Sequence, residues 1–295
     1  MNIHLLPDDV EEIDLSKQNL TYLPDLSRFY NLKKLDCSFN FLTTLPPLNE
    51  HLEKLYCYHN CLTSLPPFNK KLEIIYCENN NLTSLPRFNE NLTNIACAFN
   101  RLTTLPPFNE KLEYLYCSNN QLTTLPLFNT HLLTVYCELN LLTNLPALNK
   151  KLKGLHCQKN LLTSLPELND NLINLNCSYN LLIRLPKLKN ILELYCHNNR
   201  LTSMGWLPPS LDIIECYCNP IYYIIDSNNR MIIKNRIQIL YKFRYLYYSL
   251  KFKKRLRDWL WVRVREPRIR EKYSTVNLLK LINGREDFDE LLENW

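Results

Sequence analysis

Cysteine is the residue type in this chain whose spacing first suggests chemistry. Eight cysteines recur every 20 residues and two more follow after one deletion, giving Cys37, Cys57, Cys77, Cys97, Cys117, Cys137, Cys157, Cys177, Cys196 and Cys216. Thiolates bind metals and exchange disulfides, so a regular file of them could form a metal ladder or a redox array. A buried thiol is also a small hydrophobic side chain. The residues around the cysteines favour one of these interpretations.

Each cysteine lies in one shared frame, as in Leu112-x-x-Leu115-x-Cys117-x-x-Asn120-x-Leu122-x-x-Leu125-Pro126. Such a short, fixed period predicts stacked small units rather than a globule around one cleft. The Leu-x-x-Leu-x-Cys segment reads as a short strand in which leucine and cysteine share the inner face. A single file also lacks the tetrahedral grouping of a metal site. We therefore predict that the cysteines pack in the core, with no metal and no cofactor.

Eleven units follow from this frame, starting at Val10, Leu32, Leu52, Leu72, Leu92, Leu112, Leu132, Leu152, Leu172, Ile191 and Leu211. The asparagine three residues after each cysteine is expected to bond backbone groups at a turn, as at Asn120. Proline after the last leucine disfavours a helix, so the return segment should be extended. Phe68, Phe88, Phe108 and Phe128 are predicted to form an apolar spine there. Cys61 and Cys218 fall outside the register, and we expect them to be the more exposed and reactive thiols.

In these motifs the chain resembles the leucine-rich repeat proteins, and most closely their short class with Leu-Pro in the second half, seen in secreted bacterial effectors. The resemblance covers about residues 10–225. The chain departs from the class in having cysteine in place of an aliphatic residue, and Phe-Asn where Leu-Pro is frequent. The resemblance implies a leucine-rich repeat solenoid with short parallel strands on a concave face and an extended, non-helical convex side. It also implies protein binding on the concave face.

Alternation along each strand sends the residues that flank the cysteine outward, onto the expected concave face. The residues predicted to bind a protein partner are Tyr56, Tyr58, Tyr76, Tyr114, Tyr116, Tyr136, His156, Tyr195, His197 and Tyr217. Exposed tyrosine is enriched in protein interfaces because it combines area with a hydroxyl group. The alternative is that tyrosine was copied with an ancestral unit, since it also suits strands and cross-strand pairing.

Charge divides the chain into two parts. Residues 1–226 hold 18 Lys and Arg against 21 Asp and Glu, whereas residues 227–295 hold 17 against 8. We predict a short N-terminal cap (1–9), the repeats (10–225) and a small, basic helical tail (226–295). Apolar residues recur at helical spacing in the tail: Ile233, Ile237, Leu240, Phe243, Tyr247 and Leu250. Pro267 is predicted to end this helix, with further helices after Ser274 and over 287–294.

The tail carries a second resemblance, through Trp261–Tyr273, Leu278–Leu281 and Asp289–Trp295. These segments are similar to a C-terminal segment common among giant-virus proteins of the mimivirus type, for which no activity is implied. Three interpretations of the tail remain open. It packs on the last repeat, it binds nucleic acid through residues 230–272, or those residues lie on an anionic membrane. The last two make the repeats a spacer and are the alternative to a binding scaffold.

Enzyme motifs are missing from the sequence. There is no His-Glu-x-x-His, Walker loop or Gly-x-Ser-x-Gly, and only 3 glycines are present. No cysteine follows Cys218, which excludes a nucleophilic-cysteine domain after the repeats. We therefore expect a non-enzymatic scaffold. The N-terminus does not read as a signal peptide, so we expect an intracellular protein with reduced thiols, in a host cytoplasm if it is viral.

Overall fold

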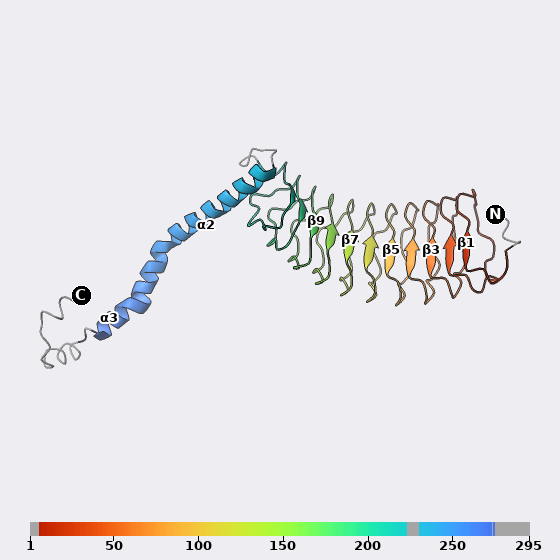
Figure 1. Ribbon diagram of the computed structural model, residues 1–295, viewed down its shortest axis with the longest axis horizontal. Coiled ribbons are helices and arrows are strands. Elements are labelled where there is room, and N and C mark those ends of the chain that lie inside the picture. The colour runs from red at the N-terminus through yellow and green to blue at the C-terminus, as the bar shows by residue number, and fades with distance from the viewer. Residues whose placement is uncertain (1–5, 223–229, 273, 275–295) are drawn as a thin grey trace. The chain divides into compact units, whose positions relative to one another are not determined.

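The computed structural model describes residues 6–222, 230–272 and 274. The chain divides into two compact units, Met1–Ile237 and Gln238–Trp295. The first unit is a stack of coils that each contribute one short strand, shown as a row of arrows in Figure 1. Residues 1–5, which include Leu5 of the expected cap, lie outside the described residues. Arg28 holds the start of the described chain, because its guanidinium bonds Asp8 at 3.0 Å and the Leu6 carbonyl at 3.2 Å.

The described residues contain one parallel sheet of eleven strands in sequence order. The strands are β1 (Glu12–Asp14), β2 (Lys34–Asp36), β3 (Lys54–Tyr56), β4 (Ile74–Tyr76), β5 (Asn94–Ala96), β6 (Tyr114–Tyr116), β7 (Thr134–Tyr136), β8 (Gly154–His156), β9 (Asn174–Asn176), β10 (Glu193–Tyr195) and β11 (Ile213–Glu215). Each strand pairs with the next without any shift in the repeat frame, so Tyr116 lies opposite Tyr136. The predicted solenoid of short parallel strands is confirmed.

The core of the solenoid is built from leucine and cysteine, as the alternation predicts. Leu115 and Cys117 are both fully buried, and Tyr116 between them is only half-buried. Leu112 before the strand and Leu122 after it pack in the same layer, and neither has any exposed surface. Because each layer is buried only by its neighbours, the stability of one repeat depends on the repeats beside it.

A ladder of buried asparagines follows the cysteines. Asn120 donates to the carbonyl of Cys97 in the preceding repeat at 3.0 Å and to that of Cys117 at 3.2 Å. Its Oδ1 accepts from the Leu102 amide at 2.9 Å. The short strands leave these turn groups without strand partners, and the amide side chain supplies both a donor and an acceptor. The role predicted for this asparagine is confirmed.

A second asparagine ladder on the return side was not predicted. Asn109 donates to the Leu92 carbonyl at 2.8 Å and accepts from the Leu112 amide at 2.8 Å. The same pattern recurs at Asn69, Asn89, Asn129 and Asn149. All of them except Asn149 directly follow a phenylalanine of the predicted spine, whose rings are stacked with centroids 6.3 to 6.4 Å apart. The Phe-Asn pair, in which this chain departs from the usual repeat, thus supplies stacked rings and an asparagine ladder on the return side.

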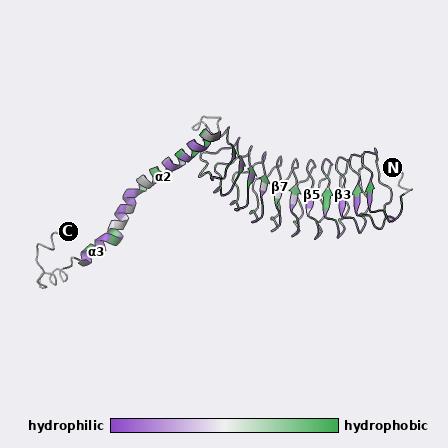
Figure 2. Ribbon diagram, viewed as in Figure 1, coloured by the Kyte–Doolittle hydropathy of each residue, from purple (hydrophilic) through white to green (hydrophobic). Residues whose placement is uncertain are grey.

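The second unit begins within a long helix. The helix α2 spans Arg230–Leu260, is followed by a π-helical turn, η2 (Trp261–Arg265), and then by α3 (Glu266–Lys272). Figure 2 shows hydrophobic and hydrophilic residues interleaved along α2. In the first unit, Ile233 and Ile237 at the start of α2 are buried, and the Lys234 ammonium donates to the Leu211 carbonyl.

The prediction that Pro267 ends the first helical stretch of the tail is wrong. Pro267 is the second residue of α3 and lies in its first turn. Proline is tolerated there because the amide it lacks has no partner within the helix. The helices predicted after Ser274 and over 287–294 lie outside the described residues. Among the described helices, none is long and apolar enough to cross a membrane.

Candidate protein-binding face

The sheet has one face turned away from the core, and we call it the open sheet face. It consists of the side chains three and one residues before each cysteine-register position and one residue after it. Most of these side chains are half-buried, because strands as close as about 4.8 Å let neighbouring side chains cover one another. All ten residues predicted to bind a partner lie on this face. The structure groups them into separate aromatic clusters rather than into one continuous stripe.

The largest aromatic contact on the open sheet face joins three strands. The rings of Tyr116 and Tyr136 are stacked at 4.9 Å, and those of Tyr136 and His156 at 4.2 Å with an angle of 3°. We call these three residues the central stack. Burial lowers the pKa of His156, with Glu193 acting in the opposite direction, so its ring is neutral at pH 7. A neutral imidazole adds flat, polar-edged area to the two tyrosines.

A second aromatic pair lies on β3 and β4. The rings of Tyr56 and Tyr76 are 5.2 Å apart at an angle of 59°. Ala96 on β5 separates this pair from the central stack and is itself buried, with 3% exposure. The neighbouring tyrosines are close enough across this gap that Tyr76 contributes to the raised pKa of Tyr116, behind burial and the nearer Tyr136. Ala96 therefore interrupts the row of aromatic rings between β4 and β6.

Of the remaining predicted residues, Tyr58 lies at the turn edge of the sheet, where the asparagine turns follow the strands, and Tyr195, His197 and Tyr217 lie in the last two repeats. Tyr58 packs edge-on against Phe39 at 5.3 Å. His197 is stacked on Tyr217 at 4.3 Å and meets Tyr179 edge-on at 5.3 Å. Tyr114 and Tyr195 are half-buried on β6 and β10. The ten residues thus form an aromatic surface with gaps at Ala96 on β5 and Asn176 on β9.

Charge on the open sheet face changes along the array. Lys34 on β2 is paired with Glu12 at 2.9 Å. From β4 to β11 the face contains four glutamates and no lysine or arginine. Glu193 accepts a hydrogen bond from Asn174 at 2.8 Å, and a Glu215 oxygen lies 3.6 Å from His197 Nδ1, which is beyond hydrogen-bond distance. The other two, Glu78 and Glu138, each hold one buried carboxylate oxygen with no hydrogen-bond partner among the described residues.

The ten cysteines that recur with the repeat, which we call the register cysteines, are buried and unreactive. All ten have 0 to 1% exposure, and burial raises the pKa of Cys37 to about 12 and that of Cys57 further above its usual range. Such thiols remain protonated, and the thiolate is the species that reacts and binds metals. Among the described residues no group of three or more His, Cys, Asp and Glu side chains is placed to hold a metal ion. Cys61 and Cys218 are exposed, as predicted.

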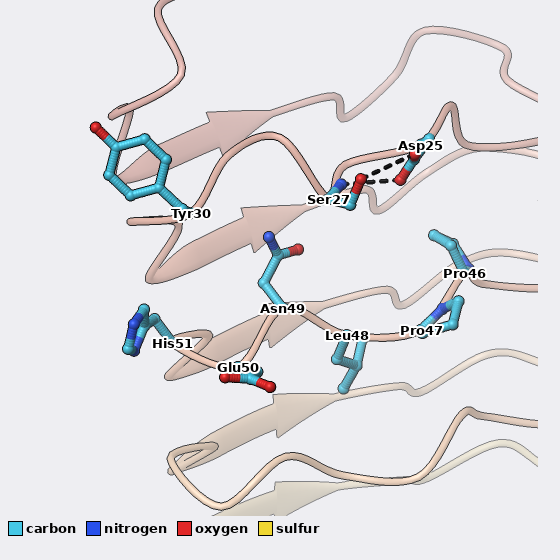
Figure 3. Close-up of a pocket in the computed structure, with 9 residues that line it drawn as sticks. All are labelled: Asp25, Ser27, Tyr30, Pro46, Pro47, Leu48, Asn49, Glu50 and His51. Atoms are coloured by element: carbon cyan, nitrogen blue, oxygen red, sulfur yellow. Dashed lines mark hydrogen bonds between the residues drawn. The ribbon is translucent and has the colours of Figure 1, made fainter.

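A shallow hollow on the return side of the first repeats brings several titratable groups together. Figure 3 shows its lining residues, which include Asp25, Tyr30, Glu50 and His51. Asp25 accepts from the Ser27 amide and hydroxyl at 2.9 Å each. His51 Nδ1 lies 2.7 Å from the Lys71 ammonium. Both side chains are thus engaged in local contacts, and the described residues of this hollow hold no paired nucleophile and base.

The turn edge of the sheet carries large exposed side chains that the sequence pattern did not predict. The residue two after each register cysteine has a left-handed backbone, as at Phe39 (φ 54°), Leu139 (φ 56°) and Tyr179 (φ 52°). Large side chains with this conformation are exposed by 40 to 54%: Phe39, Phe99, Leu139 and Tyr179. Further along the same turns, Leu141, Leu161 and Ile183 are 45 to 58% exposed. The sequence carries a signal for this conformation. In several repeats the residue before the ladder asparagine is itself asparagine, as at Asn79 and Asn119, and asparagine tolerates a left-handed backbone.

Comparisons with known proteins agree with this geometry. The family model described as leucine-rich repeats in 2 copies matches residues 50–90. YopM, a leucine-rich effector protein from Yersinia pestis, is 30% identical with a TM-score of 0.64, and the match covers 71% of this chain and 66% of that one. A leucine-rich repeat protein from Leptospira interrogans is 29% identical with a TM-score of 0.59, covering 72% of this chain and 67% of that one.

A third similar structure is the functional domain of InlJ from Listeria monocytogenes, which includes a cysteine ladder. It is 28% identical with a TM-score of 0.57, and the match covers 67% of this chain and 46% of that one. No curated protein sequence matches the chain. The chain spans less than two thirds of the YopM structures from Yersinia pestis and Yersinia enterocolitica, at 66% and 56% of their lengths.

The repeat frame, the eleven-stranded parallel sheet and these matches together show that the chain has the leucine-rich repeat solenoid fold. Within that class, its structural neighbours include bacterial effectors such as YopM. This solenoid fold is typical of scaffolds for protein interaction, because a row of repeats presents one extended surface instead of a closed active site.

Proposed function

We propose that the protein is a non-enzymatic scaffold that binds a partner protein on the open sheet face, the face expected to be concave. The observation that carries the proposal is the central stack of Tyr116, Tyr136 and His156. Three rings lie parallel across neighbouring strands and are only partly covered. Such rings offer a large, rigid area at low cost in conformational entropy, which is the usual character of interface anchors.

The test removes the central stack without touching the core. In the full chain, Tyr116→Ser with Tyr136→Ser should weaken partner binding by about tenfold or more, since anchor residues contribute about 2 kcal/mol or more each. The matched control is Tyr22→Ser with Tyr30→Ser, because these tyrosines are 73% and 59% exposed outside the open sheet face. Partners recovered from cell extract with the wild-type chain would be compared across the two variants. Equal recovery by all three proteins contradicts the proposal.

The proposal extends to the setting in which the scaffold acts. The C-terminal resemblance to giant-virus proteins supports a viral origin, and then the partner would be a host protein met in the cytoplasm of an infected cell. The similarity to effector proteins supports the same kind of role. Fractionation of infected cells with an antibody to this chain tests the location, and recovery in the extracellular medium alone contradicts it.

A second candidate function rests on the basic residues of α2. Lys253, Lys254 and Arg255 are consecutive and exposed. Clustered exposed cations bind phosphate groups of nucleic acids or anionic lipids, and both kinds of binding weaken steeply with salt. Changing these three residues to glutamate should abolish binding to RNA or to phosphatidylserine vesicles at low salt. If neither ligand binds the wild-type chain at 50 mM salt, the tail has no such role and the repeats are not a spacer for it.

A further inference from the structure

The open sheet face between β4 and β8 combines aromatic rings with carboxylates and contains no cation. Glu78 follows Tyr76 on β4, and Glu138 follows Tyr136 on β7, two residues on in each case. Side chains two residues apart point to the same side of a strand and lie about 7 Å apart. Each pair therefore places a tyrosine ring and a carboxylate beside one another on the same surface, although both faces of the Tyr136 ring are covered by Tyr116 and His156.

The two glutamates are poorly satisfied within the protein. One carboxylate oxygen of each is buried and has no hydrogen-bond partner among the described residues. Burial raises the pKa of Glu78, and a hydrogen bond from its own backbone amide acts in the opposite direction without offsetting the burial. Both side chains are only half-buried, so a cationic ligand can reach the outer part of each carboxylate and supply it with charged donors. Glu193 on the same face does not share this state, because it accepts a hydrogen bond from Asn174.

On these grounds, and resting on the proposed protein-binding role, we propose that this face recognises an extended peptide segment with two basic residues, one on each tyrosine–glutamate pair. Strands β4 and β7 are three positions apart in the sheet, which is about 14 Å. An extended chain covers that distance in about four residues. The fitting segment therefore carries arginine or lysine at positions one and five. Arginine suits both positions better than lysine, because its planar, forked group matches the geometry of a carboxylate.

The test selects peptides on the intact full-length protein from a phage-displayed library of random dodecapeptides. Selection should enrich pairs of basic residues four positions apart. A synthetic peptide with two arginines at that spacing should bind at least about tenfold more tightly than the same peptide with glutamates in their place. In the protein, Glu78→Gln with Glu138→Gln should lower the affinity for the arginine peptide by about tenfold or more.

A matched control removes the same charge elsewhere. Glu90→Gln with Glu110→Gln takes two exposed carboxylates from the return segments and should change the affinity by less than about twofold. The inference is overturned if the selected peptides are not basic, if arginine and glutamate peptides bind equally, or if the Glu78 and Glu138 variant binds like the control. The peptide exchange uses the wild-type protein, so it decides the question even if a variant does not fold.

The outcome also separates this inference from the proposed function. If selected peptides lose binding on Tyr116→Ser with Tyr136→Ser but are not basic, the protein-binding face stands and the preference for cations fails. If the selected peptides depend neither on these tyrosines nor on the two glutamates, the inference fails, and the recovery of partners from cell extract decides the proposed function. Binding that depends on the tyrosines and on the two glutamates supports both.

Discussion

At the scale of single residues, the cysteines show how position decides chemistry. A thiol between Leu115 and Asn120 is enclosed by neighbouring repeats, and the same side chain at position 61 or 218 is exposed at the turn edge. Desolvation disfavours the thiolate, so the buried thiols are held in the unreactive form. The regular spacing, which first suggested metal or redox chemistry, thus marks the residues least able to perform it.

Thiol reactivity should therefore divide the 12 cysteines into two groups. In the native protein, Cys61 and Cys218 are expected to react with a water-soluble disulfide reagent, and the ten buried cysteines only after unfolding. Colorimetric titration before and after addition of denaturant measures the two populations. The Cys61→Ser and Cys218→Ser double variant should show no rapid phase, and a rapid phase that persists in it would contradict this assignment.

At the scale of the repeat, the asparagine ladder substitutes for the longer strands of ordinary sheets. Strands of three residues form few backbone bonds, and the turn beside them leaves amides and carbonyls that stacking would bury. Asn120 satisfies groups in its own repeat and in the one before it, through Cys97, Leu102, Cys117 and Ser118. The ladder therefore couples neighbouring repeats as well as closing each turn.

Replacing Asn120 by alanine should lower the free energy of unfolding by about 3 kcal/mol or more, because several buried backbone groups lose their partner at about 1 to 3 kcal/mol each. The control is Gln121→Ala, since Gln121 is exposed next to it and should cost less than about 0.5 kcal/mol. Urea denaturation followed by circular dichroism measures both variants. Similar midpoints for the two would mean that water replaces the ladder, and the assignment would be wrong.

At the scale of the whole molecule, the repeated burial of one titratable group makes stability depend on pH. Ten register thiols have a pKa well above that of a free thiol, which is about 8.5. In the unfolded chain they release protons above that pH, while in the folded chain they keep them. The stabilising difference is therefore complete below about pH 8.5 and is lost as the pH rises.

Alkaline unfolding should accordingly be steep. Each fully retained proton costs about 1.4 kcal/mol of stability per pH unit, so ten thiols acting together exceed the usual stability of a domain within about one to two units above pH 8.5. The pH dependence of the urea midpoint from pH 8 to 11 measures the slope. Cys117→Ala with Cys137→Ala should reduce the slope by about two protons, and an unchanged slope would contradict the buried-thiol explanation.

The sequence alone determined the solenoid, because the same apolar pattern recurs in eleven repeats. The period fixed the register, and alternation placed Cys117 inside and Tyr116 outside. The recurring positions of Asn120 and Phe108 predicted the turn and the spine. Only the tertiary structure decided which tyrosines meet, since stacking depends on the neighbouring repeat: Tyr136 has His156 beside it, while Tyr76 faces Ala96. It likewise decided which glutamates lack donors, because a carboxylate at one repeat position is satisfied or left bare by what the adjacent repeats present to it.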